Sequence, residues 1–597
     1  MSDYDIVIRG GAVFDGLANE PVIADVGVRE GFVAAIGDIS GRGAQEIDAR
    51  GKIVTPGFVD IHTHYDGQVT WENRLAPSCE HGVTTVVMGN CGVGFAPCRP
   101  HQRQMLVELM EGVEDIPEVV MTDGLPWNWE SFPGYLDALE ARHLDVDIAA
   151  QLPHSAVRIF VMGERALRRE APSADDLKTM RAIVAEAISA GAFGVTTSRN
   201  MMHRTKEGAL APSLHSELEE LCALMDGLVD AEGGVFQIIP APDGDASREF
   251  ELLRRIAEHG RRPLSFTLLD VAGQPGGGWR HMLEGLELAA KDGLEMRGQV
   301  APRPVGMFFG LDLSLHLFSC HPSYRAIAHL PLAERVAIMR DPAFRTRLLG
   351  EEPSDSNPVT LNLVAAFRAA CSWGENPHYE PARSDRMEEM ARAAGQSLEE
   401  YSYDRLLEGE GKAVFYLPAA NYSGGSLANV RSMLGHPNTV MGLADGGAHY
   451  GLICDASFPT FLLQRWARDA AEEERIPLPK AIAELTSKPA AAVGLTDRGR
   501  IAEGWKADMN VIDLDALRLH VPQVSYDLPA GGRRMHQKAD GYAATIVSGE
   551  ITYLGGKATG ALPGRLVRRG RLATPGQATA SPVNQAGRPE EPVSVSA

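Results

Sequence analysis

Two histidines separated by a single residue give the sequence its strongest chemical signal. His62 and His64 lie in the segment PGFVDIHTHYDG, whose apolar first half is typical of a β-strand. Side chains two residues apart on a strand point to the same face, so both imidazoles are expected to face one site. Two imidazoles at the end of a strand suit Zn²⁺ or a similar divalent ion. The alternative interpretation is a pair of packed histidines that binds no metal.

The elements that would position this pair form an alternation of strands and helices. The segment 173–191, for example, has a serine at its start, an apolar period of 3.6 residues and a terminal glycine, which predicts a helix. Strands alternating with helices predict an α/β fold with a parallel sheet, and eight such strands can close a (β/α)₈ barrel with its active site at their C-terminal ends. The predicted strands are 53–62, 83–89, 145–152, 192–198, 234–239, 263–269, 295–300 and 438–445.

The two ends of the chain have a different residue pattern from its middle. Residues 1–55 and 495–570 carry short β-branched runs between Gly and Asp turns, which predicts one discontinuous β domain built from both termini. The barrel is then expected over 56–494. Two connections, at about 90–144 and 301–437, are too long for plain strand–helix units, and we expect lids or substrate walls there. Residues 571–597, rich in Pro, Ala, Ser and Thr, are expected to form a disordered tail.

Composition excludes several classes of protein. The chain has 597 residues, of which 44% are hydrophobic and 23% charged, as in ordinary globular proteins. Its net charge of −22 disfavours nucleic acid and anionic membranes as partners. The N-terminus has no signal-peptide pattern, and no apolar run approaches the ~18 residues of a membrane span. Seven cysteines, a small and odd number, do not indicate a disulfide framework, so we expect a cytoplasmic protein. The expected partner is a small-molecule substrate, and a homo-oligomer remains open.

Longer motifs, taken in order, carry a family resemblance over nearly the whole chain to about residue 570. The sequence resembles the amidohydrolase superfamily and, within it, the D-aminoacylase (N-acyl-D-amino-acid deacylase) branch. This resemblance implies a metal-bearing (β/α)₈ barrel and a small β-sandwich made of both termini. The segments that carry it are GKIVTPGFVDIHTHYDGQ, HGVTTVVMGNCGVGFAP, LPWNWESFPGYLDAL, TSKPAAAVGLTDRGRIAEGWKADMNVID and DGYAATIVSGE.

The resemblance assigns roles to two further residues. Cys91, in GNCG after the second predicted strand, matches a metal-ligating cysteine of the branch; the alternative is a small buried residue. Asp445, in GLADGG at the end of the eighth strand, matches the catalytic aspartate, which would touch the metal and act as general base and then general acid. The alternative for Asp445 is an aspartate that forms a turn before two glycines.

The sequence also departs from the pattern of the branch. Gln237 and Thr267 stand where the family usually has metal-binding histidines on strands five and six, and both are weak zinc ligands. His62, His64 and Asp445, with or without Cys91, still suffice for a catalytic zinc site, so one zinc is favoured and two remain open. His154, after strand three, and His449, four residues beyond Asp445, are expected to contribute to substrate binding, together with Gln237 and Thr267. For His154 the alternative is a loop histidine bonded to the backbone.

A second departure concerns the substrate. The stretch AHYGLICDASFPTF has no arginine before Arg465, whereas carboxylate-binding relatives use an arginine soon after the catalytic aspartate. We therefore predict hydrolysis of an amide or related C–N bond in a neutral or cationic amphipathic substrate, with the inserts supplying an aromatic and apolar wall. The alternatives are a true N-acyl-D-amino-acid deacylase and, in another class, a barrel that binds a metabolite without catalysis.

Overall fold

The computed structural model describes residues 2–242, 244–374 and 378–571. The predicted tail therefore lies outside the described residues, apart from Arg571. No helix in the described part of the chain is long and apolar enough to cross a membrane.

The middle of the chain is an α/β structure whose parallel strands pair in sequence order. One sheet joins β6 (Phe58–Thr63), β7 (Val83–Met88) and β8 (Asp147–Ala150). The second has the order β17-β13-β12-β11-β10-β9. Gln151 alone separates β8 from β9, and a parallel bridge from Thr63 to Gly446 connects β6 with the segment after β17. The pairings thus run through eight strand positions and return to the first. The strands of the second sheet are β9 (Leu152–Pro153), β10 (Gly194–Ser198), β11 (Val235–Ile239), β12 (Leu264–Thr267), β13 (Met296–Val300) and β17 (Thr439–Met441).

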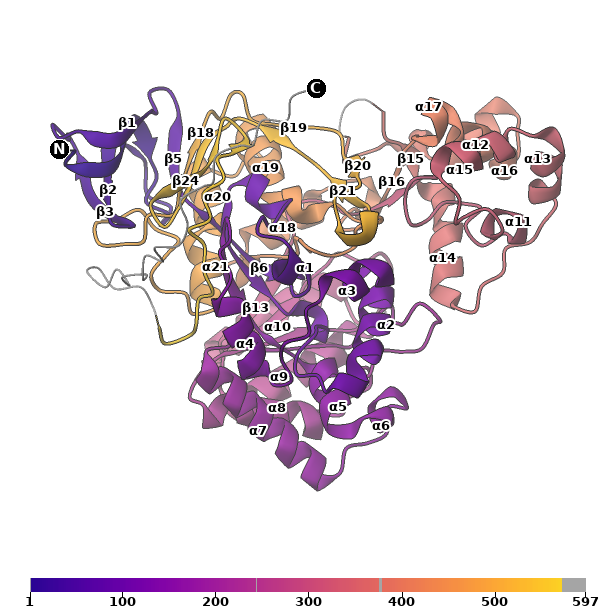
Figure 1. Cartoon of the computed structure of the whole chain (residues 1–597), viewed down its shortest axis with the longest axis horizontal. Helices are drawn as coiled ribbons and strands as arrows, with labels where there is room; N and C mark the ends of the chain where they lie inside the picture. The colour runs from indigo at the N-terminus through magenta and orange to yellow at the C-terminus, as the bar shows by residue number, and fades with distance from the viewer. Residues whose placement is uncertain (1, 243, 375–377, 572–597) are drawn as a thin grey trace, which may run out of the picture.

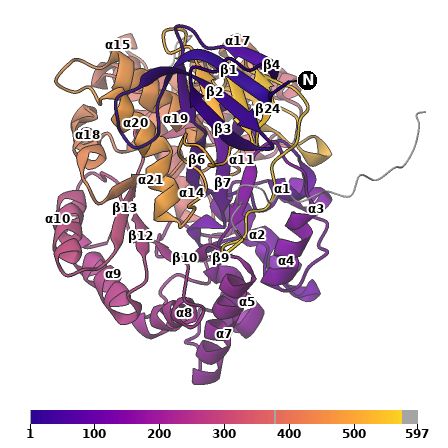
Figure 2. The ribbon, with the colours of Figure 1, turned by 90° about the vertical axis from the view of Figure 1, so that its left-hand side faces the viewer.

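Amphipathic helices cover the outside of this strand circuit. Helix α7 (Ala174–Ala190) starts at Ser173, whose side chain accepts a hydrogen bond from the Asp176 amide, and it ends at Gly191 in the left-handed conformation. Its buried side chains face the strands, and α8 (Leu218–Asp230), α9 (Ala246–Gly260) and α10 (Gly278–Lys291) follow in the same way. Figure 2 shows α8, α9 and α10 outside β10, β12 and β13. The helices leave the C-terminal ends of the strands free to carry the site.

The first predicted strand, 53–62, is in fact two strands in two sheets. β5 (Ile53–Pro56) pairs with β1 (Tyr4–Val13) and β18 (Met509–Ile512) of a sheet built from the two ends of the chain, whereas β6 pairs with β7. Gly57 lies at the break, where a Cβ atom would come within 2.1 Å of the Thr84 hydroxyl oxygen. The prediction of one strand was wrong because an apolar run does not show where the chain changes sheets.

Both ends of the chain contribute to one nine-stranded sheet, with the order β25-β24-β23-β18-β5-β1-β2-β3 and β4 on β1. The N-terminal and C-terminal strands lie side by side in Figure 1. Its remaining strands are β2 (Val22–Arg29), β3 (Phe32–Gly37), β4 (Gly43–Asp48), β23 (Tyr542–Val547), β24 (Glu550–Leu554) and β25 (Lys557–Ala558).

The two long connections are folded. The connection 90–144 holds α2 (Arg103–Glu114), α3 (Glu118–Gly124) and α4 (Phe132–Glu140). The connection 301–437 holds a small sheet of β14 (Val305–Phe309), β16 (Phe415–Ala420) and β15 (Cys371–Ser372). Its helices surround a hydrophobic core of their own, which includes Phe309, Phe367 and Tyr403. Figure 1 shows these helices projecting to one side of the strand circuit.

A buried cluster of charges links the segment before β18 to the strand circuit. The Arg498 guanidinium, 3% exposed, lies 2.6 Å from Asp147 on β8 and donates to the Thr85 hydroxyl on β7 at 3.0 Å. Lys506 contacts the same Asp147 carboxylate at 2.8 Å and Asp508 at 2.6 Å. Asp497, 8% exposed, is a third carboxylate and lies 2.9 Å from Arg498. Two cations therefore serve three carboxylates, and the loss of either cation would leave buried negative charge without a partner.

Arg498→Met is therefore expected to lower the free energy of unfolding by about 3–5 kcal/mol, since it leaves a buried carboxylate short of its partner. Urea denaturation followed by circular dichroism would measure this loss. Arg181→Ala is the matched control: Arg181 is 44% exposed, pairs with the exposed Asp230, and should cost at most about 1 kcal/mol. Equal losses in the two variants would contradict the structural role given to Arg498.

Candidate metal centre

Four side chains from three strand ends form the centre. His62 and His64 end β6 and are 1% and 0% exposed, while Thr63 between them turns away and donates its hydroxyl to the Val87 carbonyl. Cys91 follows β7 with φ at 57°, and Asp445 follows β17 with φ at 51°. Left-handed backbone at a residue other than glycine costs free energy, and such residues concentrate at functional sites. The sequence prediction of His62, His64, Cys91 and Asp445 as neighbours therefore agrees with the geometry.

The ligand atoms of His62, His64 and Cys91 all lie within 4.8 Å of one another, and Asp445 lies against the two imidazoles. The Asp445 Oδ1 atom lies 3.3 Å from His62 Nε2 and 3.4 Å from His64 Nε2. The Cys91 sulfur lies 3.6 Å and 3.7 Å from the same two nitrogens. Zinc bonds of about 2.0–2.1 Å to N or O and about 2.3 Å to S place tetrahedral ligand atoms about 3.3–3.6 Å apart. The residues present thus fit a bound divalent ion in both chemistry and spacing.

Burial sets the protonation of this group. Burial lowers the pKa of His62 to about 4, which keeps the imidazole neutral as a metal requires. Burial would raise the pKa of Asp445, yet the hydrogen bond with His64 and the nearby imidazoles hold it below the ordinary value. Burial raises the pKa of the Cys91 thiol to about 12. A bound cation reverses that last effect, because it stabilises the thiolate directly.

Glu114 is a member of the site that sequence reasoning missed. It ends α2, is 1% exposed, and has no hydrogen-bond partner for either carboxylate oxygen among the described residues. Those oxygens lie 3.4 Å from His64 Nδ1 and 3.5 Å from His449 Nε2. Carboxylates in this position orient a metal-binding histidine and fix its tautomer. A glutamate in an apolar helix of the insert 90–144 gave no signal of this role.

Amide side chains occupy the other side of His62. Its Nδ1 atom lies 2.8 Å from the Gln299 oxygen and 3.0 Å from the Gln237 nitrogen. Gln237, predicted to bind substrate, is 2% exposed and instead contacts this histidine. Gln299 was missed, because it lies in the mixed strand sequence MRGQV, where nothing local marks it. Thr267 does line the cavity beside the centre, and its hydroxyl has no partner among the described residues.

Of the two histidines predicted to bind substrate, one lies at the cavity and the other does not. His449 lines the cavity together with His62, Cys91 and Asp445. His154, in contrast, is fully buried, and its ring nitrogens bond Thr197 Oγ1 at 2.8 Å and Glu220 at 2.9 Å. The structure does not bring His154 to the cavity, and its partners are side chains rather than the backbone.

The cavity above the centre has a volume of about 740 Å³. The insert 301–437 lines it with aliphatic and thioether side chains such as Val305, Met307 and Leu363. The aromatic wall predicted from the inserts is not what forms here, because Phe308 and Phe309 point into hydrophobic cores instead. The wall is apolar, but its side chains are flexible ones.

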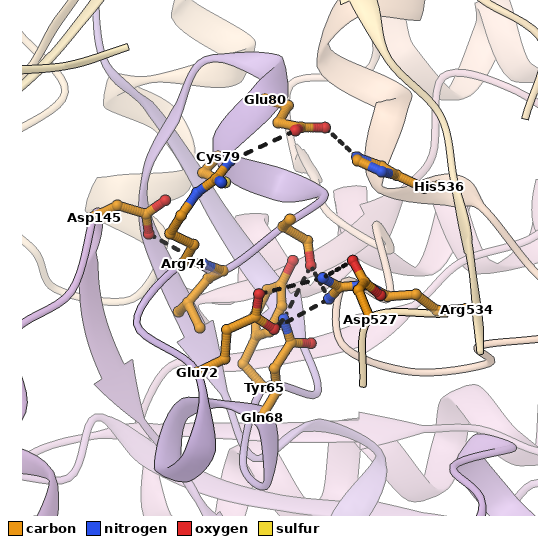
Figure 3. Close-up of polar contacts among 12 residues, drawn as sticks. Tyr65, Gln68, Glu72, Arg74, Cys79, Glu80, Asp145, Asp527, Arg534 and His536 are labelled. Atoms are coloured by element: carbon orange, nitrogen blue, oxygen red, sulfur yellow. Dashed lines mark hydrogen bonds and ion pairs between the residues drawn. The ribbon is translucent and has the colours of Figure 1, made fainter. Parts of the chain in front are cut away.

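A segment from the C-terminal part of the chain reaches the same cavity. Arg533 lines it and donates to the Leu313 carbonyl at 3.0 Å. The next residue, Arg534, is 4% exposed and is fixed between Glu72 at 3.3 Å and Asp527 at 2.9 Å, as Figure 3 shows. A contact between His536 and Glu80 adds a second attachment (Figure 3). Arg533 therefore comes to the cavity from a segment anchored on residues close to β6.

Comparison with known proteins decides the family. The sequence model of the amidohydrolase family matches residues 45–553. The chain belongs to the amidohydrolase family. It is a metal-dependent amidohydrolase, as the sequence resemblance predicted.

Individual amidohydrolases agree with the predicted branch. D-aminoacylase of Alcaligenes xylosoxydans xylosoxydans is 27% identical over 517 residues, which cover 85% of this chain and 88% of that protein. N-acyl-D-glutamate deacylase of the same organism is 28% identical, over 86% of this chain and 88% of its own length. The solved N-acyl-D-glutamate deacylase of Bordetella bronchiseptica, complexed with zinc and a phosphonate inhibitor, superposes with a TM-score of 0.63 at 22% identity, over 95% of this chain and 99% of that one. This last likeness supports the fold.

Glu114→Gln is expected to lower the affinity of this amidohydrolase for zinc about 10- to 100-fold, because an amide supports His64 less well than a carboxylate does. Competition with a chromogenic chelator on the purified full chain would measure the change. Glu111→Gln is the control, since Glu111 lies on the same helix but pairs with Lys206 at 2.9 Å. Unchanged affinity in Glu114→Gln would show that Glu114 does not orient a metal ligand.

Proposed function

We propose that this amidohydrolase hydrolyses an amide or related C–N bond of a small amphipathic substrate with water activated by one divalent ion, zinc being the first choice. The observation that carries the proposal is the grouping of His62, His64 and Cys91, with Asp445 against the two imidazoles. Of these four residues, His62, Cys91 and Asp445 line a large, mainly apolar cavity. A donor set of this kind with solvent access is typical of catalytic rather than purely structural metal sites.

The strand circuit and the terminal sheet support an architecture for this site. We interpret the circuit as a (β/α)₈ barrel over 56–494, since its pairings return to β6 through the Thr63–Gly446 bridge. The discontinuous β domain over 1–55 and 495–570 is the second unit, for which we keep the proposal of a β-sandwich. In a barrel the C-terminal ends of the strands form the catalytic face, which is where the four ligands lie.

The residues divide the reaction between them. His62, His64, Cys91 and Asp445 would hold the ion, which supplies a water of lowered pKa and polarises the scissile carbonyl when bound. The Asp445 carboxylate, whose pKa lies below its ordinary value, faces the cavity and would accept a proton from the attacking water and later return it to the leaving nitrogen. Thr267 and His449 line the cavity within the same site and are proposed to contact the substrate.

The charge of the substrate separates two candidates. The neutral or cationic substrate predicted from sequence rests on the lack of an arginine soon after Asp445. Arg533 now supplies a guanidinium to the cavity, and no ion pair holds it among the described residues, whereas the other cavity cation, Lys206, is paired with Glu111. This observation favours the second candidate, an N-acyl-D-amino-acid deacylase in which Arg533 binds the substrate carboxylate.

Asp445→Asn is expected to lower kcat about 10²- to 10⁴-fold, since an amide cannot accept the proton of the attacking water. Steady-state assays on a panel of N-acyl amides would measure kcat, and plasma mass spectrometry would show that metal remains on His62, His64 and Cys91. Asp355→Asn is the control, because Asp355 lines the cavity but binds Arg325. A kcat within tenfold of the unmodified enzyme would contradict the role of Asp445, and turnover that survives removal of metal by a chelator would contradict the metal mechanism.

Arg533→Met decides between the two substrates. For an N-acyl-D-amino acid we expect KM to rise about 10- to 100-fold, as befits the loss of a hydrogen bond between charged groups, with kcat changed less. The carboxamide of the same compound should be processed equally by both proteins. Lys206→Met serves as the control for loss of a cavity cation. If the unmodified enzyme prefers the carboxamide, and Arg533→Met leaves both KM values unchanged, the neutral or cationic substrate stands.

A further inference from the structure

A chain of buried amides runs across four strand positions beneath the metal centre. Gln151 donates to Gln237 Oε1 at 3.1 Å, and Gln237 donates to Gln299 Oε1 at 3.3 Å. Gln299 in turn donates to the Ser265 hydroxyl at 3.1 Å. All four side chains are at most 6% exposed. We call Gln151, Gln237, Gln299 and Ser265 the amide chain.

The amide chain differs from the other side of the centre in its hydrogen bonding. Each member bonds the next one, whereas His64 Nδ1 and both oxygens of Glu114 have no hydrogen-bond partner among the described residues. The chain ends on a metal ligand, because Gln299 Oε1 lies 2.8 Å from His62 Nδ1. Because the Gln299 carbonyl oxygen can only accept, this bond assigns the proton to Nδ1 and leaves the Nε2 lone pair facing Cys91 and Asp445. The 3.0 Å approach of the Gln237 nitrogen to the same Nδ1 atom is then not a hydrogen bond.

We propose that the amide chain is a positioning device that fixes His62 for a single ion and closes the adjacent position to a second one. The inference rests on the proposed function only in requiring a metal on His62. It assigns Gln299 the role of orienting His62, and Gln237 the role of orienting Gln299 through the shared oxygen.

Charge and donor chemistry explain the exclusion of a second ion. Two neutral imidazoles, one thiolate and one carboxylate balance a single divalent ion, and the further carboxylate of the centre, Glu114, lies against His64 and His449 rather than against His62. Gln237 presents its NH₂ group there, at 3.0 Å from His62 Nδ1, and an NH₂ group repels a cation. Thr267, beside Gln299 in the register of β12 and β13, offers only a weak hydroxyl ligand.

The first experiment measures zinc affinity by chelator competition in two variants of Gln299. Gln299→Met has nearly the same volume but no acceptor, and we expect affinity to fall about 10- to 100-fold. Gln299→Glu keeps the acceptor and should stay within a fewfold of the unmodified protein. Unfolding of both metal-free proteins by urea separates a loss of orientation from a loss of fold. Equal affinity in Gln299→Met and the unmodified protein would overturn the positioning role.

The second experiment counts bound metal by plasma mass spectrometry after zinc loading and gel filtration. We expect one ion per chain in the unmodified protein and two in the double variant Gln237→His/Thr267→His, in which two imidazoles replace the amide and the hydroxyl. Gln237→Leu/Thr267→Val removes the same polar groups without adding ligands and should retain at most one ion. Two ions in the unmodified protein, or one in the histidine variant with its fold intact, would overturn the exclusion.

Neither experiment depends on turnover. If the metal counts and affinities follow the expectation while no C–N substrate is cleaved, the proposed function fails and the inference stands. If hydrolysis is found and the unmodified protein holds two ions, the proposed function stands and the inference fails.

Discussion

Negative charge is concentrated in a buried place, and the rest of the structure depends on how that charge is compensated. Cys91 and Asp445 face two imidazoles, and Glu114 adds a second carboxylate behind His64. Burial lowers the pKa of His62, whereas the nearby Glu114, Cys91 and Asp445 outweigh burial and raise the pKa of His64. Separating such groups from water costs several kcal/mol per ion unless an opposite charge lies among them. A divalent cation held between these ligand atoms would provide that charge. The fold is arranged so that this position lies where the cavity gives access to it.

Closure of the strand circuit brings the ligands together. His64 donates its backbone N–H to the Gly446 carbonyl at 2.7 Å, and Asp445 donates to the His62 carbonyl at 3.2 Å. The first and last strands are therefore tied to each other at the very residues that carry the ligands. Gly447, with φ at 87°, allows Tyr65 to pack against this turn, where a Cβ atom would lie 2.8 Å from the tyrosine ring. Such over-determined contacts hold Asp445 in its left-handed conformation.

The sequence predicted what lies on the strands themselves, and it missed what distant segments bring. Strands are marked by local sequence patterns, so β7 was expected at 83–89 and is found at Val83–Met88. The apolar residues before His62 likewise predicted its place near the end of a strand, where β6 has it. Gln299 contacts His62 across 237 residues of chain, and no local pattern encodes such a pairing. His154 failed for the same reason, since its direction is set by Glu220, 66 residues further on. Arg533 was missed because it lies far along the chain from Asp445, whereas the carboxylate-binding arginine of relatives was expected soon after that aspartate.

The metal centre and the substrate-binding wall come from different parts of the chain. The metal ligands and the amide chain lie on or next to the paired strands, and the backbone hydrogen bonds between these strands fix the positions of their residues. The cavity wall and Arg533 belong to segments added to the circuit, namely the insert 301–437 and the C-terminal segment attached through Arg534. Arg534 pairs with the carboxylates of Glu72 and Asp527, whereas the adjacent Arg533 has only the Leu313 carbonyl as a side-chain hydrogen-bond partner within the described part of the chain. The chemistry of the bond and the selection of the substrate can therefore change independently, since they rest on parts of the chain that are held by different interactions.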